Sequence, residues 1–252
     1  MPGVRFRVAV ASGKGGVGKS TLAANLAVAA AKNGLKVGLM DADIHGPSVP
    51  MLFGLRDARP QADSDKRIIP LQAHGVVVMS IGFLVPEETA VIWRGPMVQG
   101  ALVQLMRDVA WENLDLLIMD MPPGTGDAAL TLCQQANLSG AVVVATPQDL
   151  ALADARKGLR MFERLGIPVL GLVENMSGFR CPHCGETSDI FGHGGVRDEA
   201  RRLGTDLLAE IPLDPALRLA SDAGTPLTAL EPDSALGQIY RDLAQKVWSK
   251  LT

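Results

Sequence analysis

A glycine-rich run near the start of the chain has the residue types and spacing of a phosphate-binding loop. Residues 13–21 fit the pattern G-x-x-x-x-G-K-[ST] and stand between an apolar segment, Val8–Ala11, and an Ala- and Leu-rich segment, Lys19–Asn33. Glycines let backbone N–H groups converge on phosphate oxygens, and the following helix adds its positive end. We therefore expect a nucleotide site made by Gly13, Lys14, Gly15, Gly16, Val17, Gly18, Lys19, Ser20 and Thr21.

The two lysines of this P-loop are expected to have different roles. Lys19 should reach the β- and γ-phosphates and Ser20 should hold Mg²⁺, so ATP and Mg²⁺ are the expected ligands. Lys14 is not needed to hold a nucleotide. Its side chain could reach a nucleotide bound by a facing subunit and neutralise charge that develops in phosphoryl transfer, or it could be an ordinary solvated lysine. The loop alone leaves both interpretations open.

Carboxylates follow two other apolar segments. Asp120 lies at the end of Leu114–Met121, where a carboxylate beside the P-loop can hold the hydration shell of Mg²⁺. Asp43, just after Lys36–Asp41, is placed to orient the attacking water. The alternative for these carboxylates is that they only stabilise turns or cap helix N-termini. For Asp127 taken alone, this alternative is the better interpretation. That residue closes the stretch PPGTGD, which predicts a stiff, glycine-hinged segment able to sense the γ-phosphate.

Apolar segments alternate with helical ones along the whole chain. Further strands are expected at Val76–Ile81, Ala141–Thr146, Pro168–Glu174 and Leu207–Ile211, and further helices at Pro96–Trp111, Asp149–Leu165 and Ser234–Leu251. Continuous apolar strands separated by helices predict a parallel sheet covered on both faces, with ligands at the carboxyl ends of the strands. We therefore expect an α/β fold, a three-layer P-loop NTPase with a mostly parallel central sheet. Residues 1–252 should form one domain, with the polar segment Arg56–Arg67 as a surface loop.

Composition and charge limit the class of protein. Apolar residues make up 47% of the chain and charged residues 20%, as in ordinary soluble globular proteins. The net charge of −3 leaves no basic surplus to neutralise phosphates, so nucleic acid is not an expected partner. No apolar run reaches the ~20 residues of a membrane helix, and residues 1–11 lack the apolar stretch of a signal peptide. We therefore expect no membrane partner and a cytoplasmic location, where the three cysteines stay reduced.

Cys181 and Cys184 lie in a Gly-, His- and Cys-rich segment, at about residues 178–195, that predicts an irregular insertion. Two thiolates do not satisfy a tetrahedral metal or a four-iron cluster, whereas a two-fold dimer supplies four. The need for four ligands therefore points to a homodimer.

The cysteine pair leaves other kinds of site open. Zinc bridged by the same four thiolates is one alternative, because a lone C-x-x-C does not distinguish the metals. A thioredoxin-like redox pair and a one-chain zinc site completed by His183 and His193 are weaker ones. Cys133, in an apolar helical stretch, is interpreted as a core residue.

Several ordered blocks of the sequence resemble the Mrp/ApbC family of iron–sulfur carrier ATPases, within the deviant-Walker group that includes the Min and nitrogenase-iron-protein ATPases. The similarity spans nearly the whole chain. Beside the P-loop it includes Asp41–Ser48 (DADIHGPS), Trp93–Met97 (WRGPM), Asp120–Asp127 (DMPPGTGD), Thr146–Asp149 (TPQD), Glu174–Ser177 (ENMS), Cys181–Gly185 (CPHCG) and Ile211–Pro215 (IPLDP).

The resemblance implies roles for individual residues. It makes Lys14 the signature lysine that acts across a nucleotide-sandwich dimer, and Asp43 the switch carboxylate needed for hydrolysis. It makes Asn175 the adenine-recognising asparagine, with Pro212 and Asp214 in the loop that lines the base. Many family members carry an additional small N-terminal domain, which is not expected in these 252 residues.

The resemblance also implies a function. We expect a slow ATP hydrolase that holds a [4Fe–4S] cluster on Cys181 and Cys184 at a homodimer interface, with cluster donors and apo iron–sulfur proteins as partners. ATP binding or hydrolysis would shift the dimer between holding and releasing states. The alternatives are a zinc-bridged dimeric ATPase, an electron-transfer reductase like the nitrogenase iron protein, and a Min- or ParA-like positioning ATPase without a cluster. The mixed charges of Ser234–Leu251 argue against the last of these.

Overall fold

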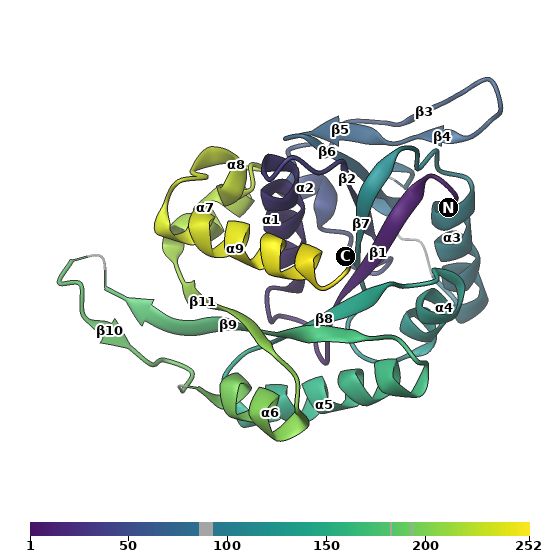
Figure 1. The fold of residues 1–252 in the computed structure, drawn as a ribbon. Helices are drawn as coiled ribbons and strands as arrows, with labels where there is room; N and C mark the ends of the chain where they lie inside the picture. The colour runs from purple at the N-terminus through teal and green to yellow at the C-terminus, as the bar shows by residue number, and fades with distance from the viewer. Residues whose placement is uncertain (86–92, 182, 193) are drawn as a thin grey trace.

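The strands form a mostly parallel sheet at the centre of the molecule (Figure 1). A computed structural model describes residues 1–85, 93–181, 183–192 and 194–252, apart from the side chains of residues 149–152. The strand order is β10 (Thr187–Ser188), β9 (Val169–Arg180), β8 (Gly140–Ala145), β1 (Val4–Ser12), β7 (Leu114–Asp120), β2 (Val37–Asp41), β6 (Val76–Ser80) and β5 (Leu71–Ala73), with β11 (Leu207–Leu213) also paired to β9. Pairing is parallel except between β10 and β9 and between β6 and β5.

Helices cover both faces of this sheet (Figure 1). One layer contains α1 (Lys19–Lys32), α2 (Val49–Leu52), α7 (Pro215–Asp222), α8 (Leu227–Leu230) and α9 (Ala235–Ser249). The other contains α3 (Gly95–Arg107), α4 (Asp127–Gln135), α5 (Asp149–Arg164) and α6 (Gly195–Leu203). The smaller elements are the turn η1 (Ile81–Phe83) and the paired strands β3 (Gln61–Ala62) and β4 (Ile68–Ile69). The fold is the predicted three-layer α/β arrangement, and none of the described helices is long and apolar enough to span a bilayer.

Strand β1 shows why an apolar run of this kind folds into the middle of the sheet. Ala9 and Ala11 pack in the core that contains α3 to α6, whereas Val8 and Val10 pack in the core that contains α1 and α9. All four residues are at most 5% exposed. A strand covered on both faces needs apolar side chains at every position, which is the continuous pattern of this segment.

The register of the parallel strands brings three carboxyl ends to one edge of the sheet. Asp41 of β2 pairs with Asp120 of β7, and Asp120 pairs with Val10 of β1. Strand β1 ends at Ser12, so the P-loop begins at the same edge. Residues far apart in the sequence therefore meet where ligands of such sheets bind.

The largest difference from the predicted elements concerns β9. The predicted strand end at Glu174 is wrong, because β9 continues to Arg180 and pairs antiparallel with β10. The first half of segment 178–195 is therefore a β-hairpin rather than an irregular insertion. Its polar and glycine residues lack an apolar pattern, and pairing with β10 and β11 holds them extended. The segment Arg56–Arg67, predicted as a loop, contains β3.

A buried pair of hydrogen-bonded residues connects the P-loop helix α1 to α8, and removing this pair of hydrogen bonds should destabilise the fold. Asn25 of α1 accepts hydrogen bonds from the N–H (3.0 Å) and the hydroxyl (3.2 Å) of Thr228, and both residues are 1% exposed. We expect Asn25→Ala to lower the free energy of unfolding by about 1–3 kcal/mol, because it leaves a buried N–H without a partner. Urea denaturation measures this loss. Asn33→Ala, which removes a hydrogen bond of an exposed amide at the C-cap of the same helix, should change stability by less than about 0.5 kcal/mol. Equal effects of the two substitutions would contradict this account.

Candidate functional site

The P-loop connects β1 to α1, and close approach of neighbouring elements explains two of its glycines. Gly18 precedes α1 with a φ of 80°, and a Cβ atom there would lie 2.2 Å from the amide nitrogen of Asn175. A Cβ atom on Gly13 would lie 2.2 Å from the carbonyl carbon of Asp154 in α5. At Gly13 the obstacle is backbone, which leaves no room for a side chain, and at Gly18 the positive φ adds strain for any residue with a Cβ atom. The chain therefore needs glycine at both positions to bring the backbone to the start of α1, where N–H groups are free to bind phosphate.

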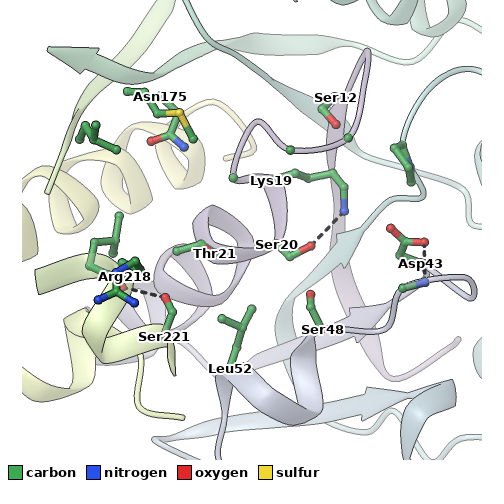
Figure 2. Close-up of a pocket in the computed structure, with 18 of the residues that line it drawn as sticks. Ser12, Lys19, Ser20, Thr21, Asp43, Ser48, Leu52, Asn175, Arg218 and Ser221 are labelled. Atoms are coloured by element: carbon green, nitrogen blue, oxygen red, sulfur yellow. Dashed lines mark hydrogen bonds between the residues drawn. The ribbon is translucent and has the colours of Figure 1, made fainter. Parts of the chain in front are cut away.

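A cavity of about 570 Å³ lies against this loop, a volume typical of small-molecule sites (Figure 2). Seven of the nine predicted loop residues line it; Gly13 and Val17 do not, since Gly13 packs on α5 and Val17 is buried in the core. The remaining wall is formed by Ser12, Asp43, Gly46, Ser48, Met51, Leu52, Pro123, Asn175, Met176, Pro212, Leu213, Asp214, Leu217, Arg218, Ser221 and Asp222. In Figure 2, Asp43 lies on one side of the loop and Arg218 on the other.

A buried ion pair fixes the lysine of the P-loop. Nζ of Lys19 lies 2.5 Å from Oδ1 of Asp120, and the two side chains are 6% and 0% exposed. The ammonium group also donates to Oγ of Ser20 at 3.2 Å (Figure 2). Charge-assisted hydrogen bonds of this kind are about twice as strong as neutral ones. The loop therefore presents a positive charge and a hydroxyl group at fixed positions in the cavity wall.

Asp41 is a second buried carboxyl group beside Asp120. Burial first, and the negative charge of Asp120 second, raise the pKa of Asp41 to about 7. Burial also raises the pKa of Asp120, against the lowering effect of Lys19. One lysine cannot neutralise two buried carboxylates, so both carboxyl groups hold their protons to a higher pH than exposed carboxyl groups do.

Asp41 also holds the segment that carries Asp43. Its Oδ1 accepts from the N–H of Asp43 at 3.1 Å, and its Oδ2 accepts from the N–H of Val49 at 3.1 Å and the hydroxyl of Ser80 at 3.0 Å. The carboxylate of Asp43 accepts from the N–H of Gly46 at 3.3 Å and lines the cavity. A buried carboxyl group thus anchors both ends of the segment from which Asp43 faces the cavity.

The oxygen atoms near Lys19 suit a hydrated magnesium ion. Oδ2 of Asp120 is buried and has no hydrogen-bond partner within the described part of the chain. Ser20 lines the cavity beside it. Magnesium in nucleotide sites takes few protein oxygens and completes its shell with water and phosphate. The residues present therefore fit a nucleotide with its magnesium ion.

The side of the cavity formed by β9, β11 and α7 contains the residues predicted to contact a base. Asn175 is 6% exposed, and its Nδ2 donates to the carbonyl of Val17 at 2.8 Å. Pro212 and Asp214 line the same cavity, and Asp214 also caps α7 by accepting from a backbone N–H at 2.7 Å. The structure therefore brings the three predicted residues together with the P-loop.

Lys14 is held through its backbone. The hydroxyl of Ser12 donates to the Lys14 carbonyl at 2.8 Å, and the side chain lines the cavity wall half-buried. Among the described residues its ammonium group forms no ion pair. Its charge is free to act on a ligand.

Cys181 and Cys184 lie at the tip of the hairpin of β9 and β10, which projects from the body of the molecule (Figure 1). The N–H of Cys181 donates to the carbonyl of Glu186, and the N–H of Gly185 donates to the carbonyl of Cys181, both at 2.9 Å. Cys181 is half-buried and Cys184 is exposed. The backbone N–H groups of Cys184 and His183 lower the pKa of the Cys181 thiol. They favour the thiolate, which is the form that binds metals.

One chain contributes few ligands to a metal at this tip. Within the ranges that the structure describes, no three His, Cys, Asp or Glu side chains gather to hold a metal, so His183 does not complete a three-ligand site with the cysteines. His193 and Pro182 lie outside the described residues. Cys133 is buried in α4, and burial raises its pKa to about 11, which confirms the interpretation of Cys133 as a core residue.

The sequence prediction missed Asp41 and the walls contributed by α2 and α7. Asp41 shows the same sequence signal as Asp120, which is a carboxylate at the end of a buried strand. The reasoning that identified Asp120 could therefore have identified Asp41. Ser48 ends the block Asp41–Ser48, but nothing in that block assigned it a role. Arg218 lies in the short helix α7 outside every motif, so no sequence signal marks it. Asp127 is exposed at the start of α4 and does not line the cavity. The N-cap of α4 is Gly126, and no side chain forms a capping hydrogen bond there, so the N-cap role predicted for Asp127 is wrong.

Comparison with known proteins identifies relatives over the whole chain. A family model described as ParA, NUBPL iron-transfer P-loop NTPase, matches residues 3–248. An iron–sulfur protein required for NADH dehydrogenase, mitochondrial, from Arabidopsis thaliana is 52% identical over 246 residues, covering 97% of this chain and 78% of that protein. An iron–sulfur cluster carrier protein of Salmonella typhimurium is 50% identical over 249 residues, covering 99% of this chain and 68% of that protein.

Solved structures share the fold. A nucleotide-binding protein from Archaeoglobus fulgidus in complex with ADP has a TM-score of 0.79 and 44% identity, covering 88% of each chain. The septum site-determining protein MinD from Pyrococcus horikoshii, with Mg-ADP, has a TM-score of 0.72, covering 97% of this chain and 96% of that one. At 24% identity the second likeness concerns the fold alone.

The ion pair of Lys19 predicts how the site responds to loss of that charge. We expect Lys19→Ala to weaken ADP binding by roughly 10- to 100-fold, because hydrogen bonds to charged groups contribute about 1.5–3 kcal/mol. Isothermal titration calorimetry measures this, on protein whose circular dichroism spectrum is unchanged. Lys32→Ala, at the exposed far end of the same helix, should bind ADP as the unmodified chain does. Unchanged affinity in Lys19→Ala would contradict the assignment.

Proposed function

Since this chain belongs to the NUBPL family of iron-transfer P-loop NTPases, we propose that it is a nucleotide-dependent carrier whose cargo is a [4Fe–4S] cluster. The cluster is held by Cys181 and Cys184 of two identical chains and is passed to apo iron–sulfur proteins. The observation that carries this proposal is the hairpin tip, which holds the free thiols of Cys181, half-buried, and Cys184, exposed. Relatives named for carrying or transferring iron–sulfur clusters support it.

The ligand count requires a second chain. A four-iron cluster takes four thiolates, and a two-fold axis beside the hairpin tip would bring two from each copy. A tetrahedral zinc ion would also need four thiolates, so the number of ligands does not distinguish zinc from a cluster, and a metal analysis has to decide.

The exposed position of the cysteines favours transfer over permanent binding. An acceptor can reach the tip, and each acceptor thiolate that binds an iron atom displaces one carrier thiolate. This exchange conserves the charge and oxidation state of the cluster, so it needs neither an oxidant nor a reductant. Cluster donors load the tip by the reverse exchange.

The nucleotide site supplies a slow ATP hydrolysis. Water attacks the γ-phosphorus, the bond to the bridging oxygen breaks, and ADP and phosphate leave. Asp43 orients this water, while Lys19 neutralises charge on the β- and γ-phosphates. Mg²⁺, held through Ser20 and Asp120, would supply further charge neutralisation when bound. Lys14 of the facing chain contributes the last positive charge, so hydrolysis waits for the dimer to close.

The two sites therefore belong to one assembly. Both the cysteine pair and Lys14 act fully only in a homodimer of this chain, with residues 1–252 of each copy acting as one domain. A change of the dimer on nucleotide binding or hydrolysis alters how the cluster is held, and by linkage the cluster alters nucleotide affinity.

The cargo is tested by reconstitution with iron and sulfide under anaerobic conditions. We expect Cys181→Ser and Cys184→Ser each to abolish the iron–sulfur absorbance and most of the bound iron, because each removes two of the four ligands of the dimer. Cys133→Ser is the matched control and should retain both, since its thiol is buried in the core. Iron content that survives in the Cys181 and Cys184 variants, or zinc in place of iron, would overturn the proposal.

The shared active site is tested by mixing two inactive variants. Lys14→Ala and Asp43→Ala should each lower ATP turnover by at least about 100-fold. A mixed dimer restores one intact site, with Asp43 from one chain and Lys14 from the other. An equal mixture should therefore recover roughly a quarter of the normal rate, since about half the dimers are mixed. Absence of recovery would show that Lys14 acts within its own chain. Undiminished turnover in either single variant would contradict the role of the residue substituted in it.

A further inference from the structure

One strand links the nucleotide cavity to the cysteine pair. Asn175 of β9 donates to the P-loop carbonyl of Val17 at 2.8 Å. Arg180 ends the same strand, where it pairs with Thr187 of β10 directly before Cys181. Asn175 and Cys181 are six residues apart, which is at most about 20 Å of extended chain. A change in the shape of this stretch therefore moves the cysteines relative to the P-loop.

Met176 interrupts the regular geometry of that stretch. It has a φ of 59°, in the left-handed region that residues with a Cβ atom disfavour. The pairing of β9 with β11 shifts at the same place, because Asn175 lies opposite Ile211 whereas Phe179 lies opposite Leu213. An advance of four residues along β9 therefore corresponds to an advance of only two residues along β11. Met176 lies in the resulting bulge, and it also lines the nucleotide cavity.

The surroundings of this bulge are tight on one side and open on the other. Toward the cavity, Asn175 is wedged against Gly18, where even a Cβ atom would lie 2.2 Å from its amide nitrogen. Toward the hairpin, a Cβ atom on Gly178 would find its nearest neighbour, Oδ1 of Asp189, at an ordinary 3.5 Å. A conformational change at Met176 would therefore move the hairpin more readily than the P-loop.

We infer that Met176 is a positioning residue that couples occupancy of the nucleotide cavity to the geometry of Cys181 and Cys184. This inference rests on the proposed carrier function. A nucleotide that fills the cavity holds Met176 in its left-handed conformation. Without that restraint the residue can pass to the extended conformation, which changes the shape of the bulge and shifts the hairpin. The backbone preference of a residue with a Cβ atom biases this equilibrium on the order of tenfold, and both ligands act on it.

Two substitutions separate the backbone from the side chain. Met176→Gly abolishes the left-handed penalty, whereas Met176→Ala keeps the penalty and removes only the atoms beyond Cβ. The measurement is the rate at which a disulfide reagent modifies the hairpin thiols, with and without ADP at a saturating concentration for each variant. Cys133→Ser in every chain removes the third thiol from the signal.

We expect ADP to change the thiol rate several-fold in the parent chain and in Met176→Ala, and less than about twofold in Met176→Gly. If ADP changes the thiol rate of Met176→Gly as much as that of the parent chain, the inference is overturned. If ADP no longer changes the rate in either variant, the coupling belongs to contacts of the methionine side chain, and the inference is overturned as well. A parent chain whose thiols do not respond to ADP would also overturn it.

The carrier function is tested separately by iron binding in the parent chain. A chain that binds the cluster while its thiols ignore ADP retains the carrier function and loses the inference. If the chain binds no iron while its thiols respond to ADP, the coupling at Met176 is retained and the proposed carrier function is overturned.

Discussion

The ion pair between Lys19 and Asp120 is the interaction on which the nucleotide site depends. It joins the P-loop to the end of β7 at 2.5 Å, inside a region where Asp120 and Asp41 are fully buried. Removing one partner of a buried pair costs about 3–5 kcal/mol, because the other charge is left without compensation. That cost holds the lysine at the cavity wall before a phosphate arrives, so binding requires little further ordering.

The same edge of the sheet organises the rest of the site. Asp41 is buried beside Asp120, and it anchors the segment of Asp43 by accepting hydrogen bonds from the N–H groups of Asp43 and Val49. On the other side of the loop, Asn175 contacts the P-loop from a strand that ends at the cysteine hairpin. A ligand at the P-loop would thus lie beside both the segment that carries Asp43 and the strand that leads to Cys181.

Much of this could be predicted from the sequence, because glycines, lysine and serine at fixed spacing have few other uses. The continuous apolar run of β1 likewise admits few places other than the centre of a covered sheet. The role of Asp41 needs the register of β2 against β7, which the sequence does not state. The extension of β9 depends on partner strands in place of an apolar pattern, and the left-handed conformation of Met176 has no sequence signal, since methionine is not a residue that favours it. Tertiary pairing decided these features.

The central claim is that two chains share one cluster. Native mass spectrometry of the anaerobically reconstituted protein measures this directly, because it reports chain number and metal content in the same ion. We expect a dimer that carries one group of four iron and four sulfide ions. A monomer that carries its own metal, or a dimer bridged by zinc, would contradict it.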